Sequence, residues 1–368
     1  MVGRRTLLRT TLVGILLLTV SGSGLAPAHA GGPRPLAVVS LGDSYIAGNA
    51  GRWLGNSPDN TGDRRGTDRA YDPSLDPPYD PALVYEDQTC WRSDVAEINQ
   101  VRFPGVTPVN LACSGATSGD IPGQSLRLAE VARTHRVLAI VLSIGGNDAH
   151  FASIVDACAR AFIVKTGPCS PSQQANLDRD LPLVRAGVGQ AIDGVRATMT
   201  AAGYRDRSYR VILQSYPAPI PLAADTRHPE SDPDAARFLV AGCPFYDADL
   251  DWGHTRLPGQ LAETLRAVAA ERGVQFLDVR EAFRGHELCH AAARQPETVP
   301  EAADSEWVRW IDVPFLQGDY LAESLHPNAY GQQALGRCLR LTLQSLGDVS
   351  CHGIPGRPPS SVYLRPLR

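Results

Sequence analysis

Four short polar motifs carry the residue types that nucleophilic catalysis uses. In chain order they are Gly-Asp-Ser-Tyr at 42–45, Ala-Cys-Ser-Gly at 112–115, Gly-Gly-Asn-Asp at 145–148 and Glu-Ser-Leu-His-Pro at 323–327. A serine hydroxyl becomes a nucleophile when a base takes its proton, and histidine is the usual base near neutral pH. Ser44 and His326 are therefore the candidate nucleophile and base. The N–H groups of Ser44 and Gly115 and the side-chain amide of Asn147 are candidate donors to a developing oxyanion.

Each motif taken alone also has a simpler structural explanation. The glycines are typical of turns, Asn147 of a side-chain cap, and a His-Pro pair of a helix start. The positions of the motifs favour the catalytic explanation, because the first three motifs coincide with the ends of apolar runs at 36–41, 109–112 and 137–144. Such runs are typical of buried parallel strands, whose carboxyl ends meet at one edge of a sheet. We therefore expect these motifs to meet at that edge.

The rest of the chain continues the alternation of strands and helices. Further strands are expected at 210–215 and 274–279, and helices at 91–100, 124–134, 149–163, 175–202, 256–272 and 328–346. This alternation, with right-handed crossovers, predicts an α/β fold in which helices cover both faces of a parallel sheet. We expect one domain at 36–346 and a C-terminal extension at 347–368.

Two long stretches, 49–88 and 217–255, interrupt this alternation and are rich in Gly, Pro and Asp. Loops of this length inside a domain are usually functional, so we expect them to form the walls of a substrate cleft. Their aromatic side chains could line an acyl groove or pack structurally: Trp53, Tyr79, Phe245 and Trp252. Calcium binding by the aspartates is an alternative, although neither stretch fits the twelve-residue calcium loop.

The N-terminus has the features of a secretory signal peptide. Arg4 and Arg5 precede an apolar stretch at 12–20, and a small-x-small site follows at 28–30. We expect residues 1–30 to be removed after Ala30, by either the Sec or the twin-arginine route, and expect no stable membrane insertion; a membrane anchor is the alternative. The whole chain has a formal net charge of −4 and no basic run, which argues against nucleic-acid binding. We expect a monomer.

All eight cysteines lie beyond the expected signal peptide. An even number of cysteines in an exported chain favours disulfides, and the absence of a C-x-x-C pair argues against zinc. Sequence alone leaves many connectivities open. The short spacings favour pairing between neighbours along the chain: Cys90–Cys113, Cys158–Cys169, Cys243–Cys289 and Cys338–Cys351.

Taken in order, the four motifs resemble the blocks of the SGNH (GDSL) hydrolase family, over roughly residues 36–345. The segments 90–93 and 111–116 are further similar to secreted actinobacterial lipases and esterases of that family. The resemblance implies a flavodoxin-like α/β/α sandwich with five parallel strands. It also implies a Ser44 nucleophile, a His326 base, oxyanion donors at Gly115 and Asn147, and no cofactor or metal. Those relatives carry three neighbour-paired disulfides, which supports the first three pairs and makes Cys338–Cys351 an addition.

The chain departs from the family at position 323. The family has an aspartate three residues before the histidine, whereas this chain has Glu323. Some relatives orient the histidine with a main-chain carbonyl instead, so either the carboxylate or the backbone of Glu323 could act here. We favour a contributing carboxylate and count Glu323 as the third catalytic residue.

The expected activity is that of a secreted serine ester hydrolase that cleaves carboxylic acyl esters, with lipid esters, including phospholipids, as the favoured substrates. The alternatives are a carbohydrate O-deacetylase of the same fold and a non-catalytic cell-envelope binding protein. A competing motif, His-Glu-Leu-Cys-His at 286–290, matches the H-E-x-x-H pattern of zinc proteases. The expected disulfide at Cys289 and the glycine at 285 argue against a zinc-binding helix there.

Overall fold

The computed structural model describes residues 34–367, apart from 60, 232–235, 299–300 and 312–319. The expected signal peptide at 1–30 lies outside the described residues. Residues Arg34–Arg368 form a compact unit built on a single large hydrophobic core. The core includes the apolar residues Ala37, Val38, Val39 and Leu41 of the first strand, all of which are buried.

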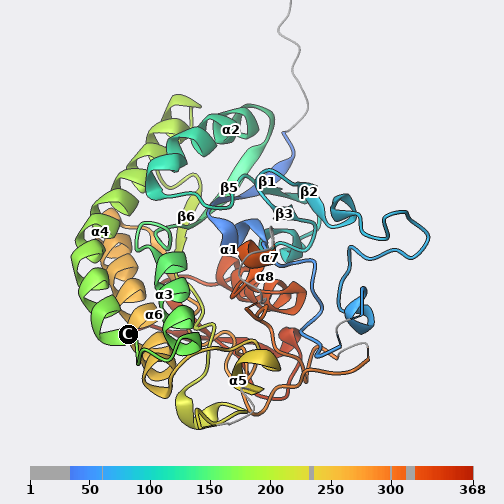
Figure 1. Cartoon of the computed structure of the whole chain (residues 1–368). Helices are drawn as coiled ribbons and strands as arrows, with labels where there is room; N and C mark the ends of the chain where they lie inside the picture. Colours follow the sequence, from blue (N-terminus) through green and yellow to red (C-terminus); the bar gives the residue numbers. More distant parts are fainter. Residues whose placement is uncertain (1–33, 60, 232–235, 299–300, 312–319, 368) are drawn as a thin grey trace, which may run out of the picture. The chain divides into compact units, whose positions relative to one another are not determined.

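A seven-stranded sheet forms the centre of this unit, in the order β4-β1-β5-β6-β7-β8-β9 (Figure 1). The strands are β1 (Leu36–Gly42), β4 (Val106–Asn110), β5 (Arg136–Ser143), β6 (Arg210–Gln214), β7 (Gln275–Asp278), β8 (Val349–His352) and β9 (Tyr363–Pro366). The first five in this order give the flavodoxin-like arrangement that was expected. The expectation of five strands was wrong in number, because the segment 347–368 adds β8 in parallel and β9 antiparallel.

Helices pack against this sheet in two groups. Helices α2, α4 and α6 lie side by side, and α8 packs with the short helices η3 and η6. The bounds of the longer helices are α2 (Ile121–Thr134), α3 (Phe151–Ile163), α4 (Ser170–Ala201), α6 (Asp247–Arg272) and α8 (Ala329–Leu343). The shorter ones are α1 (Ser44–Ala47), α5 (Ala236–Leu239), α7 (Tyr320–Glu323), η1 (Arg64–Gly66), η2 (Pro81–Leu83), η3 (Glu97–Gln100), η4 (Ser118–Asp120), η5 (Ala223–Asp225) and η6 (Pro359–Ser361).

The helix expected at 91–100 does not form. This segment instead begins with β3 (Arg92–Ser93), which pairs with β2 (Tyr85–Asp87), and ends in η3. Trp91 has a φ of 52°, which is outside the helical region. The Cys90–Cys113 disulfide also ties the start of the segment to the loop after β4. Tertiary constraints therefore override the helical pattern of the sequence.

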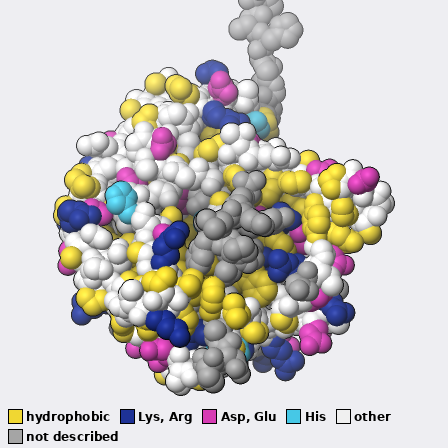
Figure 2. All heavy atoms as spheres, viewed as in Figure 1, with side chains coloured by type: hydrophobic (Ala, Val, Ile, Leu, Met, Phe, Trp, Pro, Cys, Tyr) yellow, Lys and Arg dark blue, Asp and Glu magenta, His cyan; other side chains and the backbone are white. Residues whose placement is uncertain are grey.

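The segment between α1 and β2 contains η1 and η2 and projects at the side of the sheet (Figure 1). Hydrophobic side chains gather on this part of the surface (Figure 2), where Leu75 and Leu83 are exposed. None of the helices in the described part of the chain is long and apolar enough to cross a bilayer.

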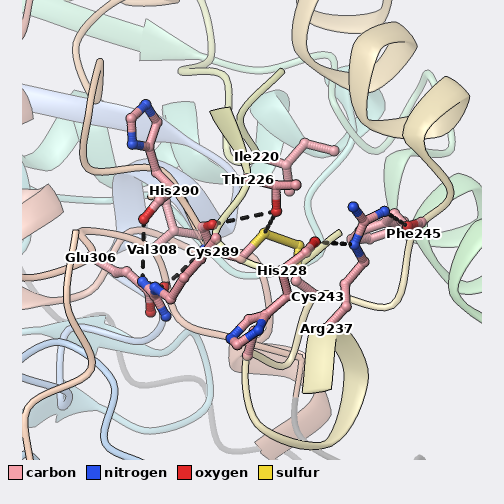
Figure 3. Close-up of a disulfide and its surroundings, with 12 residues drawn as sticks. Ile220, Thr226, His228, Arg237, Cys243, Phe245, Cys289, His290, Glu306 and Val308 are labelled. Atoms are coloured by element: carbon pink, nitrogen blue, oxygen red, sulfur yellow. Dashed lines mark hydrogen bonds and ion pairs between the residues drawn. A yellow bond between two sulfur atoms is a disulfide. The ribbon is translucent and has the colours of Figure 1, made fainter. Parts of the chain in front are cut away.

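Four disulfides cross-link the unit, and no cysteine is free. They join the neighbours along the chain that the spacing favours: Cys90–Cys113, Cys158–Cys169, Cys243–Cys289 and Cys338–Cys351. Figure 3 shows the third of these, which links the long stretch after β6 to the segment after β7. Arg237 supports the same region by donating to the carbonyl oxygens of His228 and Phe245 (Figure 3).

Candidate active site

The chain turns sharply between β1 and α1, and this turn places Ser44 at the carboxyl edge of the sheet. Gly42 is opposite Ser143 in the β1–β5 register, with a φ of 143°. A side chain at Gly42 would approach the carbonyl oxygen of Ser143 to 2.0 Å, so only glycine fits. The Gln124 amide fixes the strand end, because it accepts from the Gly42 N–H and donates to the Gly42 carbonyl, each at 2.8 Å. No pattern in the sequence indicated this role of Gln124.

His326 faces Ser44 from the loop between α7 and α8. Its Nε2 lies 2.7 Å from the Ser44 Oγ, and its Nδ1 lies 3.0 Å from the carbonyl oxygen of Ser324. A carbonyl oxygen can only accept, so Nδ1 carries the proton and Nε2 is left to accept the serine proton. Tyr45 supports the loop by donating its hydroxyl to the Leu325 carbonyl at 2.7 Å. The two groups that an acyl transfer needs are thus within hydrogen-bonding distance.

Burial lowers the pKa of His326 to about 4. Hydrogen bonds with the backbone of Ser324 and Glu323 raise this pKa, but they offset only part of the effect of burial. The imidazole is therefore neutral at neutral pH, which is the state a general base needs. A base with so low a pKa is weak in the resting site. Negative charge that develops on a substrate oxygen would stabilise the imidazolium and favour the proton transfer during the reaction.

The expected oxyanion donors lie at the ends of β1, β4 and β5. Cys113 donates its N–H to the Gly42 carbonyl at 3.0 Å, which brings the loop containing Gly115 to the Ser44 turn. Asn147 donates its amide to the carbonyl of Ala116 at 2.8 Å and lines the same pocket as Ser44. One of its two amide protons is thus used, and the other is left for a ligand. Among the hydrogen bonds of the described residues, none uses the N–H of Ser44 or of Gly115.

Asp43 and Tyr216 connect the nucleophile turn to the oxyanion turn. Asp43 accepts a hydrogen bond from the Tyr45 N–H and one from the Tyr216 hydroxyl. The same hydroxyl accepts from the Gly146 N–H at 3.0 Å. Burial raises the pKa of Asp43 to about 7 and raises that of Tyr216 well above its usual value, so the phenol keeps its proton. The chain of bonds holds Ser44 in place relative to residue 147.

The Glu323 carboxylate points away from the imidazole, contrary to the contribution that we favoured. Its two oxygens accept from the Trp53 indole N–H at 2.7 Å and from the Tyr85 hydroxyl at 2.6 Å. The side chain is fully buried, and burial raises its pKa, although Arg52 and these two hydrogen bonds oppose the shift. The backbone oxygen facing Nδ1 belongs to Ser324 rather than to Glu323. Among the hydrogen bonds of the described residues, none joins the Glu323 carboxylate to Nδ1, and the Glu323 backbone acts on the imidazole only by raising its pKa.

A hollow opens in front of the serine–histidine pair, and we call it the proximal pocket. Its polar lining comes from the motif residues, and most of the remainder is apolar: Phe151, Ala152, Pro217, Pro219, Leu257, Pro258 and Leu261. The stretch at 217–255 thus contributes to its wall, as expected. Among the described residues the lining includes none from 49–88. A bound acyl group would find apolar surface next to Ser44.

The four aromatic residues of the long stretches have separate roles. Phe245 and Trp252 line a second apolar hollow, described below. Trp53 is buried and bonds Glu323, while the Tyr79 ring packs on Tyr71 at 5.2 Å. The sequence did not indicate the bonds of Trp53 and Tyr85 to Glu323, because these partners are distant along the chain.

The H-E-x-x-H segment lacks the helix that would place both histidines on one face. Residues 286–290 are non-helical and end in a β-bridge from His290 to Thr226, and the buried His286 ring stacks on Trp307 at 3.8 Å. His290 is directed away from the Cys243–Cys289 disulfide (Figure 3). The segment is therefore part of the core rather than a zinc site of the protease type.

One other group of possible metal ligands gathers among the residues that the structure describes. It consists of Cys158, Cys169 and Asp249. The two sulfurs form a disulfide, and the carboxylate oxygens accept from the N–H groups of Cys169 and Ser170 at 3.1 and 2.8 Å. These atoms are engaged in the fold and do not form a metal site.

A parallel α/β sheet with a serine–histidine pair at its carboxyl edge is the architecture of serine hydrolases. Comparison with known proteins identifies the family. The model of the GDSL-like Lipase/Acylhydrolase family matches residues 40–334, and the chain belongs to this family of ester hydrolases. The expected SGNH (GDSL) membership is confirmed.

The relatives include two proteins from Streptomyces coelicolor. Lipase 2 is 27% identical over 328 residues, which cover 88% of this chain and 91% of the relative. Lipase 1 is 27% identical over 338 residues, covering 88% and 95%. Among solved structures, an extracellular lipase from Streptomyces rimosus aligns over 84% of this chain and 100% of its own, with 22% identity and a TM-score of 0.49.

Proposed function

We propose that this ester hydrolase cleaves acyl esters of lipids through an acyl-enzyme on Ser44. The 2.7 Å contact between the Ser44 Oγ and the His326 Nε2, beside an apolar pocket, is the observation that carries the proposal. Family membership and the two related lipases agree with it.

In the first half of the proposed reaction, Ser44 Oγ attacks the ester carbonyl carbon while its proton moves to His326 Nε2. The N–H groups of Ser44 and Gly115 and the amide of Asn147 stabilise the oxyanion. The tetrahedral intermediate collapses by breaking the bond to the alcohol oxygen, which takes the proton from Nε2. In the second half, water attacks the acyl-enzyme, His326 takes its proton, and the proton returns to Ser44 as the acid leaves.

The role that we infer for Glu323 is to position the loop that holds His326. Its carboxylate ties this loop to Trp53 and Tyr85, which belong to a distant part of the sequence. Arg309 lies over the Trp53 ring at 3.5 Å, and its backbone N–H bonds the carbonyl of His326 at 2.9 Å. The Ser324 carbonyl orients the imidazole itself by accepting the Nδ1 proton of His326.

We infer that the protein works outside the cytoplasm. All its cysteines are paired in disulfides, which persist in oxidising compartments. The N-terminal arginines, apolar stretch and small-x-small site are those of a cleaved signal peptide. Mass spectrometry of the exported protein would test this, with Gly31 expected as the first residue.

A panel of p-nitrophenyl esters from acetate to palmitate, assayed with Ser44→Ala as control, tests the proposed reaction. A lipid hydrolase should prefer acyl chains longer than acetyl, and the variant should lose at least about a thousandfold in kcat. Preference for acetate would favour the carbohydrate deacetylase instead. Absence of serine-dependent hydrolysis throughout the panel would favour the non-catalytic binding protein.

A further inference from the structure

A second apolar hollow, the distal pocket, adjoins the proximal pocket. Its lining is formed by α3, the loop after β6, the start of α6 and the His326 loop, and it includes Phe151, Val155, Pro219, Asp249, Trp252 and Leu257. Three of these side chains, Phe151, Pro219 and Leu257, also line the proximal pocket. They therefore form the wall between the two hollows.

The polar atoms around the distal pocket are already engaged in hydrogen bonds. Both carboxylate oxygens of Asp249 accept backbone N–H groups at the start of α4. The indole N–H of Trp252 donates to the Gln174 side chain at 2.7 Å. What remains for a ligand is hydrocarbon and aromatic ring surface, which suits a methylene chain and not a sugar or a charged group.

Phe151 is the wall residue that aromatic contacts link to the catalytic histidine. It is the first residue of α3 and follows His150, whose φ is 54°. Its ring packs edge-on against Tyr45 at 6.2 Å, and the Tyr45 ring in turn lies 4.8 Å from that of His326. A chain that starts at Ser44 and runs along the proximal pocket thus meets Phe151 before it reaches the distal pocket.

We propose that the distal pocket is the far part of an acyl-binding channel and that Phe151 sets the length of acyl chain that the enzyme accepts. The inference rests on the proposed function, because it takes the acyl group to be attached to Ser44. Leu257 of α6 and Pro219 of the loop after β6 form the rest of the wall that the two pockets share. Each methylene group of the acyl chain that moves from water into the distal pocket should raise kcat/KM about fourfold.

The test uses Phe151→Ala and the ratio of kcat/KM for p-nitrophenyl dodecanoate to that for the butyrate. Removing the Phe151 ring from the wall between the pockets should raise this ratio at least about tenfold, which is the effect of burying roughly two methylene groups. Val155→Phe, which fills the distal pocket only, should cancel the gain when combined with Phe151→Ala. Leu257→Ala provides a second way to open the wall, and Val155→Leu a milder filling.

Phe162→Ala is the matched control, because it removes the same atoms from the same helix without lining either pocket. Its ratio should stay at the wild-type value. An unchanged ratio in both Phe151→Ala and Leu257→Ala would overturn the proposal, and so would a gain that survives Val155→Phe. If Ser44→Ala retained full hydrolysis, the proposed function would fail instead, which separates the two failures.

Discussion

Replacement of Glu323 by glutamine is expected to cost no more than about tenfold in kcat. The carboxylate bonds Trp53 and Tyr85, not the imidazole, so no tautomer of His326 depends on it. Glutamine can keep both contacts, because its oxygen accepts from the indole N–H and its NH₂ donates to the phenol oxygen. An acid that directly held the histidine, as in a Ser-His-Asp triad, would cost about 10⁴ when neutralised.

Glu323→Ala should lower stability and activity more than Glu323→Gln, because it removes the contacts that hold the His326 loop. It leaves two buried donors unpaired at about 1–3 kcal/mol each, or about 2–6 kcal/mol in unfolding free energy. We expect a fall in Tm and a loss of about 10–100-fold in kcat as the His326 loop loosens. The pH profile should keep its acid limb, because the group that titrates is unchanged.

The assay is kcat and kcat/KM against pH for both Glu323 variants, with Tm from thermal unfolding. Glu306→Gln is the matched control, since Glu306 is also fully buried but bonds Asn56, Arg227 and the Cys289 N–H. A loss of 10³ or more in a stably folded Glu323→Gln would refute the reasoning, because it would mean that the carboxylate charge acts on His326.

Three further predictions concern separate parts of the molecule. Asn147→Ala should lower kcat by about 10²–10³ with little change in KM, whereas a change confined to KM would make Asn147 a substrate-binding residue. Activity should fall as the pH drops through about 4, where His326 becomes protonated; an acid limb near 6.5 in kcat/KM would contradict the lowered pKa. Because the unfolded imidazole already binds its proton below about 6.5, this group also destabilises the fold as pH falls from there towards 4. Replacing Cys243 and Cys289 by serine opens a link that spans 46 residues and should cost about 4 kcal/mol in chemical unfolding; wild-type stability would exclude the pair as a structural cross-link.

Much of the sheet and of the active-site layout follows from local sequence. The apolar runs gave β1 and β5 to within a residue, and the Gly42–Ser143 register explains why the motif residues after these strands meet. Parallel strands make this possible, because motifs distant in sequence need only end neighbouring strands.

What sequence could not predict depends on contacts between distant segments. The partners of Glu323 lie 270 and 238 residues away, and no local pattern links Glu323 to Trp53 or Tyr85. Strands β8 and β9 are four residues long each and pair with each other in antiparallel fashion. Neither contains the long apolar run that marks a buried parallel strand in the sequence. Phe245 and Trp53 both lie in long stretches without an apolar period, yet Phe245 lines a pocket and Trp53 is a hydrogen-bond donor in the core.

The central claim is that Ser44 carries the acyl group, and covalent labelling tests it most directly. A fluorophosphonate reacts with a serine that a neighbouring base activates, and peptide mass mapping locates the adduct. We predict one adduct, on Ser44, that is absent in Ser44→Ala and forms much more slowly in His326→Ala. An adduct on another serine, or ester hydrolysis that persists undiminished in Ser44→Ala, would contradict the account.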